Sequence, residues 1–309
     1  MVAFKKLISV CLSIALSISI IVLIFNIVLK ENVFNESWYK NTASELGLYK
    51  EIKDKVEENL KYVTTDSNIT DNDSIYQNIV TDEYINNEVD KILDENFKAI
   101  NNESYNKDVI NVDDIINVYN KRIYDYFVSR NVIMDDAANQ VIGTIKLEAQ
   151  NEVTTAISSI NFWTFLEAHR NSSTLNLFFK LSVLSNANVT TFCYIVMVIT
   201  MLGILIFNLS HLSSFLNFAG IAIFIGGAIP FSIGYGGSLS KISDNILFMG
   251  STANELLTEL VNSCFKILTI YGGVFVIIGA LCAIASSITV SVSRRIRAKS
   301  SLDKTSLIR

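Results

Sequence analysis

Four stretches of the chain carry no charged side chain and are long enough to cross a lipid bilayer. They cover residues 7–29, 191–209, 215–235 and 267–292. A membrane-spanning helix needs about 20 predominantly apolar residues, and in lipid its backbone groups must be hydrogen-bonded within the helix. The sequence therefore predicts an all-α integral membrane protein with four transmembrane helices, the last three grouped in residues 191–293.

The first apolar run is predicted to be an uncleaved anchor rather than a secretion signal. It is longer than the apolar core of a signal peptide, which has about 7–15 residues. No small-x-small cleavage site follows it, since the next residues are Lys30, Glu31 and Asn32. Residues 1–30 are therefore expected to form a cytoplasmic tip and the first anchor.

Basic residues at the two ends of the predicted bundle set its orientation. They are Lys5 and Lys6 before the first span, and Arg294, Arg295 and Arg297 in a basic tail over residues 294–309. Positively charged flanks stay on the cytoplasmic side of the membrane. Both termini are therefore expected in the cytoplasm and the protein in the plasma membrane. Residues 31–190 and a shorter loop over 236–266 then lie outside.

The predicted outer segment is acidic. Residues 30–190 hold 26 acidic and 15 basic side chains, whereas the two cytoplasmic tails are basic. An acidic surface repels phosphate backbones, so no nucleic-acid partner is expected. The basic tail is interpreted as a topology signal that contacts lipid headgroups.

Hydrophobic periodicity predicts that this outer segment is a helical domain. Apolar residues recur at helical spacing over residues 34–63, with Asn35 or Ser37 as the cap, and over 82–97, capped by Thr81. They recur again over 112–128 and from Asp135 to Trp163. A further helix is expected to begin at the capping box of Thr252 and Glu255 and to run into the fourth span.

No arrangement of residues predicts catalysis, a metal site or a cofactor. Residues 66–77 have the acidic start of a calcium loop, but Asp71 stands where glycine is needed and Gln77 where glutamate is needed. His169 and His211 belong to no metal-binding spacing. The chain is therefore not expected to be an enzyme. A disulfide between Cys193 and Cys264 remains open.

Small residues on the predicted spans indicate close helix packing. Ser9, Ser13 and Ser17 form a stripe on the first span. The residues expected to pack helices or to bend one are Gly226, Gly227, Pro230, Gly234, Gly272, Gly279 and Ala283. The stretch SIGYGG, residues 232–237, resembles the filter of potassium channels. However, Phe231 stands where the filter has its first threonine, and a re-entrant filter at this point would place the basic tail outside, against the charge rule. It is interpreted as the outer end of the third span, where glycines end the helix.

This layout resembles uncharacterised multi-pass membrane proteins of low-GC Gram-positive bacteria. The shared features are one anchor, the stretch NESWYKNTASELGLYKEI just after it, a large helical extracytoplasmic loop and an apolar C-terminal half. The resemblance implies an architecture and no activity.

Two hypotheses of function follow. The first is a binding or scaffold protein in the lipid bilayer, whose outer domain contacts a protein partner or copies of itself. The second is an oligomeric conduit for small ions or solutes through the glycine-rich helices.

Overall fold

The structure is a computed structural model that describes residues 2–69, 73–101, 103–106, 109–162, 180, 182–209, 211–241 and 251–306. It is 85% helix, and the described ranges contain no strand. Among the described residues, four helices are long and apolar enough to cross a membrane. The all-helical prediction with four candidate spans is thus confirmed. The chain divides into two compact units.

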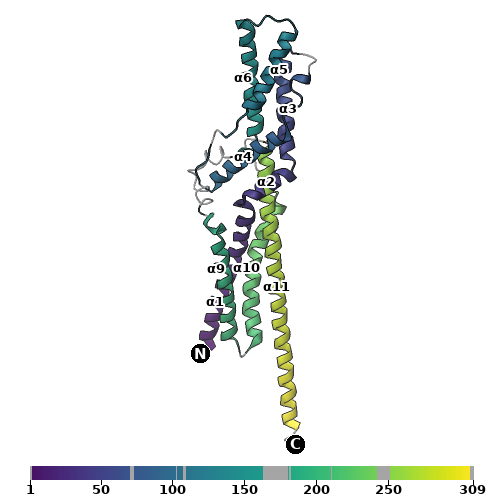
Figure 1. Cartoon of the computed structure of the whole chain (residues 1–309). Helices are drawn as coiled ribbons and strands as arrows, with labels where there is room; N and C mark the ends of the chain where they lie inside the picture. Colours follow the sequence, from purple (N-terminus) through teal and green to yellow (C-terminus); the bar gives the residue numbers. More distant parts are fainter. Residues whose placement is uncertain are drawn as a thin grey trace. The chain divides into compact units, whose positions relative to one another are not determined.

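The first unit is a bundle of the four long apolar helices (Figure 1). They are α1 (Val2–Val28), which the π-helical turn η1 (Leu29–Val33) extends, α9 (Ala187–Phe207), α10 (Leu212–Leu239) and α11 (Ser251–Ser306), which joins the bundle from Val261 onward. A short 3-10 turn, η3 (Ser182–Ser185), precedes α9. Large apolar side chains such as Phe192, Ile277 and Leu281 are exposed, as is typical of helices that face lipid.

Helix α1 packs against both α9 and α10. Leu16, Ile20 and Ile24 of α1 are buried in this contact. The serine stripe of α1 contributes hydrogen bonds between helices. Ser13 Oγ donates to the carbonyl oxygen of Phe218 at 3.1 Å, and Ser17 Oγ donates to that of Ala222 at 2.8 Å. Small polar residues of this kind let two apolar helices approach closely.

Two asparagines near the end of α1 are buried, and the sequence prediction did not single them out. Asn26 bonds through its amide nitrogen to the carbonyl oxygen of Leu184, and its amide oxygen accepts a bond of 2.5 Å from the hydroxyl of Thr190. Asn32, in η1, donates to Ser263 Oγ at 2.7 Å. Each amide is therefore paired, as a buried polar group must be.

The second unit contains the shorter helices (Figure 1). They are α2 (Glu36–Glu45), α3 (Leu48–Asp66), the 3-10 turn η2 (Asp73–Ile75), α4 (Asp82–Ile100), α5 (Asp113–Ser129), α6 (Asp136–Ser158) and the first turns of α11. The predicted caps Asn35 and Thr81 form, since their side chains accept backbone N–H bonds at the starts of α2 and α4. The side chain of Asp135 caps α6 in the same way.

The prediction of one helix over residues 34–63 is wrong. The chain breaks at Gly47, which has a positive φ of 73° and separates α2 from α3. Glycine adopts this left-handed conformation at little cost because it has no Cβ. The apolar period continues across the break, so the pattern alone did not reveal it.

The second unit has a core of its own, built from α2 to α6 with Leu256 of α11. Tyr119 lies fully buried in it, with its hydroxyl 2.9 Å from the hydroxyl of Thr64. Burial raises the pKa of Tyr119 to about 12, although the bond to Thr64 acts against this. Tyr119 is thus a neutral core residue.

The predicted end of α10 needs correction, since Gly234 and Gly237 do not end this helix, which continues to Leu239. The helix expected near Thr252 is confirmed, because α11 begins at Ser251 and is continuous through residues 267–292. Thr252 lies inside α11, where its hydroxyl donates to Glu51 at 3.2 Å and accepts from Ser159 at 3.1 Å.

The two cysteines considered for a disulfide, Cys193 and Cys264, are free thiols. The predicted Trp163 and His169 lie outside the described residues.

Candidate functional site

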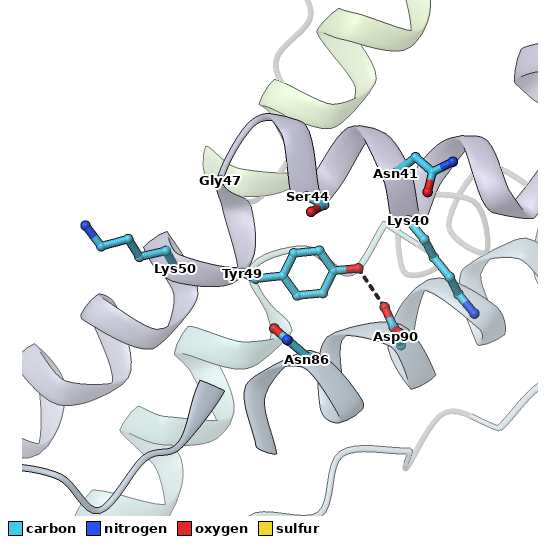
Figure 2. Close-up of a pocket in the computed structure, with 8 residues that line it drawn as sticks. All are labelled: Lys40, Asn41, Ser44, Gly47, Tyr49, Lys50, Asn86 and Asp90. Carbon is cyan, nitrogen blue, oxygen red and sulfur yellow. Dashed lines mark hydrogen bonds between the residues drawn. The ribbon is translucent and has the colours of Figure 1, made fainter. Parts of the chain in front are cut away.

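A polar pocket of about 420 Å³ lies between α2, α3 and α4 of the second unit (Figure 2). It is lined by Lys40, Asn41, Ser44, Gly47, Tyr49, Lys50, Asn86 and Asp90. The break at Gly47 shapes this pocket, because it turns the chain between α2 and α3, and both helices pack against α4. A second hollow of about 460 Å³ shares Tyr49, Lys50 and Asn86 with the first.

Tyr49 and Asp90 face one another across the pocket (Figure 2). The Tyr49 hydroxyl donates to Asp90 Oδ1 at 2.6 Å. Burial first, and then the Asp90 carboxylate, raise the pKa of Tyr49 well above its usual value. The phenol therefore stays neutral, and its hydrogen bond to Asp90 holds both side chains in fixed positions.

Lys40 pairs with one carboxylate of its own helix and with one of α4, and the second pair joins α2 to α4. Its Nζ lies 3.0 Å from Glu36 Oε1 and 2.5 Å from Asp94 Oδ1. Burial acts to lower the pKa of Lys40, but the two carboxylates outweigh burial and the pKa is raised. The bond from Lys40 likewise lowers the pKa of Glu36. The charge of Lys40 is thus compensated.

Lys53 makes the corresponding bridge between α3 and α4. Its Nζ lies 2.6 Å from Asp82 Oδ1, and this bond raises the pKa of Lys53. Exposed ion pairs contribute only about 0–1 kcal/mol each. Their role here is to fix the spacing of the helices that form the pocket walls.

Four polar side chains of the lining have no hydrogen-bond or ion-pair partner among the described residues. They are Asn41, Ser44, Lys50 and Asn86. The two amides and the hydroxyl both donate and accept hydrogen bonds. The lining offers no cysteine or histidine, and no group of three or more metal-ligand side chains occurs in the described part of the chain. This arrangement can bind a polar molecule through hydrogen bonds.

The glycines predicted to pack helices lie where α10 meets α11 in the bundle. A Cβ added to Gly227 would lie 2.6 Å from the carbonyl oxygen of Gly272, and one added to Gly279 would lie 2.5 Å from the nitrogen of Phe224. A Cβ added to Gly234 would lie 2.6 Å from the carbonyl oxygen of Phe265. Real Cβ atoms do not approach so closely, so the two backbones are in direct contact at these positions.

The remaining predicted packing residues occupy neighbouring positions. An added Cβ at Gly226 would lie 2.9 Å from the Cβ of Ile20, so this glycine contacts α1 rather than α11. Ala283 of α11 faces Gly220, whose added Cβ would lie 3.2 Å from its nitrogen. Pro230 is buried within α10, which continues past it.

The predicted topology residues lie at the ends of the bundle helices. Lys5 and Lys6 are exposed in the first turns of α1, whereas Arg294, Arg295 and Arg297 lie in α11 with side chains outside the described part.

Comparison with protein-family models, with curated proteins and with solved structures gives no match.

The sequence prediction missed the pocket. It assigned Tyr49 to an apolar helix face, and it gave the polar residues of α4 no role. The available signal was the spacing of Asp82, Asn86, Asp90 and Asp94, each four residues after the last. Such residues share one face of a helix, but the pattern does not say what that face contacts.

Proposed function

We propose that this chain is a membrane-anchored binding or scaffold protein. The four-span bundle holds it in the plasma membrane with both termini in the cytoplasm, and the second unit lies outside. That unit presents its surface to a protein partner or to a second copy of the chain. The observation that carries the proposal is the separate, well-filled core of the second unit, because a folded domain of this kind is suited to recognition.

The surface of the second unit supports an interaction role. Ile133, between α5 and α6, is 82% exposed, and Tyr62, Val141 and Leu147 are exposed as well. These apolar side chains are accessible to a partner protein. The acidic character of the same segment favours a partner surface that is basic or uncharged over an anionic one.

The bundle gives less support to the alternative of a conduit. A conduit would need glycines of these helices to line a path, whereas Gly227, Gly234, Gly272 and Gly279 hold α10 and α11 in direct backbone contact. The four apolar runs also lack Asp, Glu, Lys and Arg, the side chains that carry ions or protons through transporters. Any path would therefore have to lie between copies of the chain rather than along these glycines.

Site-specific photo-cross-linking in living cells tests the proposal. A photoreactive phenylalanine analogue is placed at Ile133 or Leu147 in the second unit, and at Ile206 or Ile277 in the bundle as exposed controls. We expect a discrete protein adduct, identified by mass spectrometry, from the second unit. Adducts that form only from the bundle positions would refute the proposal.

A further inference from the structure

One face of α4 carries four polar residues at regular spacing, and three of them are already engaged. Asp82 pairs with Lys53, Asp90 accepts from Tyr49, and Asp94 pairs with Lys40. The fourth member of this stripe is Asn86, which has no partner among the described residues. Asn86 lines both hollows, and Figure 2 shows its side chain in the first of them.

We propose that the hollow between α2, α3 and α4 binds a neutral, hydroxyl-rich ligand of the sugar class. This inference deepens the proposed function, on which it rests, because it gives the outer unit a ligand class. Asn86 would be the central contact, with Asn41 and Ser44 on the facing wall.

The balance of charge decides against a phosphate or a metal ion as the ligand. The ammonium groups of Lys40 and Lys53 are neutralised by carboxylates. Lys50 has no ion-pair partner among the described residues, but the two linings together hold as many aspartates (Asp54, Asp82 and Asp90) as lysines (Lys40, Lys50 and Lys53), so the hollow has no net positive charge to attract an anion. The Asp90 carboxylate lines the same hollow and accepts a hydrogen bond from the Tyr49 hydroxyl. The carboxylates of the stripe are thus committed to holding the walls together, and a lone carboxylate is a poor cation site.

The free groups match the hydrogen bonding of a sugar. Each sugar hydroxyl both donates and accepts, and it needs partners that do the same at short range. The amides of Asn41 and Asn86 each supply two donors and one acceptor, and the Ser44 hydroxyl supplies one donor and two acceptors. Asp90 Oδ2 has no partner among the described residues and adds a further acceptor.

The size and rigidity of the hollow fit a short oligosaccharide. The hollow measures about 420 Å³, and the neighbouring hollow that shares Tyr49, Lys50 and Asn86 with it measures about 460 Å³; small-molecule pockets range from about 300 to 1,000 Å³. The ring of Tyr49 lines both hollows, and an aromatic ring offers an apolar surface to the C–H groups of a sugar. The bridges from Lys40, Tyr49 and Lys53 to α4 hold the walls in place before a ligand arrives, which limits the entropy lost on binding.

The test uses the purified full chain in lipid nanodiscs, free of sugar-based detergent. Saturation-transfer NMR measures binding of the N-acetylglucosamine trimer, of maltotriose and of inorganic phosphate. The variant Asn86→Ala is compared with Asn87→Ala, a matched change at the next, exposed position of α4 that does not line the hollow.

We expect at least one trisaccharide to bind and Asn86→Ala to weaken it about ten-fold, through the loss of two hydrogen bonds. Asn87→Ala should leave binding unchanged, and circular dichroism should show both variants folded. Absence of trisaccharide binding, equal effects of the two variants, or binding of phosphate alone would overturn the inference. Cross-linking from Ile133 and Leu147 would not depend on these results, so the proposed function is judged separately.

Discussion

At Gly227 the backbones of α10 and α11 leave no room for a side chain. We expect Gly227→Ala to destabilise the bundle by about 1–3 kcal/mol, because the new methyl group overlaps the carbonyl oxygen of Gly272 and the Cβ of Phe275. Reversible unfolding of the reconstituted protein in a denaturing detergent measures this loss.

Gly236 provides the matched control in the same helix. A Cβ added there meets no atom within 4 Å, so Gly236→Ala should be neutral or stabilising by up to about 1 kcal/mol, as expected for alanine in a helix. If both variants lost the same stability, backbone contact at Gly227 would not be the cause.

A substitution at Gly47 tests the energetic cost of a backbone conformation rather than the cost of a packing clash. An added Cβ meets nothing within 4 Å, but the φ of 73° is unfavourable for any residue with a side chain. We expect Gly47→Ala to cost about 1–2 kcal/mol, whereas Gly143→Ala, inside α6 and equally free of contacts, should gain up to about 1 kcal/mol. Thermal unfolding followed by circular dichroism compares them, and a gain at both positions would contradict the assigned break.

At the level of single elements, two buried carboxylates of α4 hold the segment that follows this helix. Glu88 and Glu95 are 4% and 8% exposed, and they accept the backbone N–H groups of Asn111 and Asn106. Burial acts to raise the pKa of Glu95, but the bonds from Lys98 and from the Asn106 N–H outweigh burial and lower the pKa below its model-peptide value of 4.5. Such a group stabilises the fold above the unfolded pKa and loses this effect as pH falls through the folded pKa.

We therefore expect the Asn106 amide to become less protected from hydrogen exchange as pH falls below 4.5, after correction for intrinsic rates. In Glu95→Gln this extra loss should be absent, since the amide has no proton to gain. Glu83→Gln, at an exposed position in the first turn of α4, should behave like the parent chain. An identical pH profile for parent and Glu95→Gln would contradict the role of this carboxylate.

The helices that the sequence predicted best combine a regular apolar face with a capping side chain. For α4 both signals are local, so Thr81 marked its start and the period marked its length. The end of α10 was predicted too early, because glycine has a low intrinsic helix propensity. In the fold, Gly237 stays helical and packs against Phe265 of α11. The pocket was missed for a similar reason, because Asn86 gains its place from contacts between helices distant in the sequence.

At the scale of the whole molecule, the chain separates two kinds of surface. The bundle exposes large apolar side chains, and the second unit carries most of the charge. We propose that the basic tails lie on the cytoplasmic side and that the acidic unit, which follows the first of the four candidate spans, lies on the opposite side. This arrangement is a proposal that labelling can test.

Single cysteines in a chain whose four native cysteines are replaced by alanine provide this test. Leu147→Cys lies on an exposed face of α6, and Leu209→Cys lies in the exposed turn after α9. We expect a membrane-impermeant maleimide to label position 147 in intact cells and position 209 only after permeabilisation. Labelling confined to position 209 would mean an inverted orientation, and labelling of both in intact cells would mean that α9 does not cross the membrane. In the first case the binding surface would have to be sought on the cytoplasmic side.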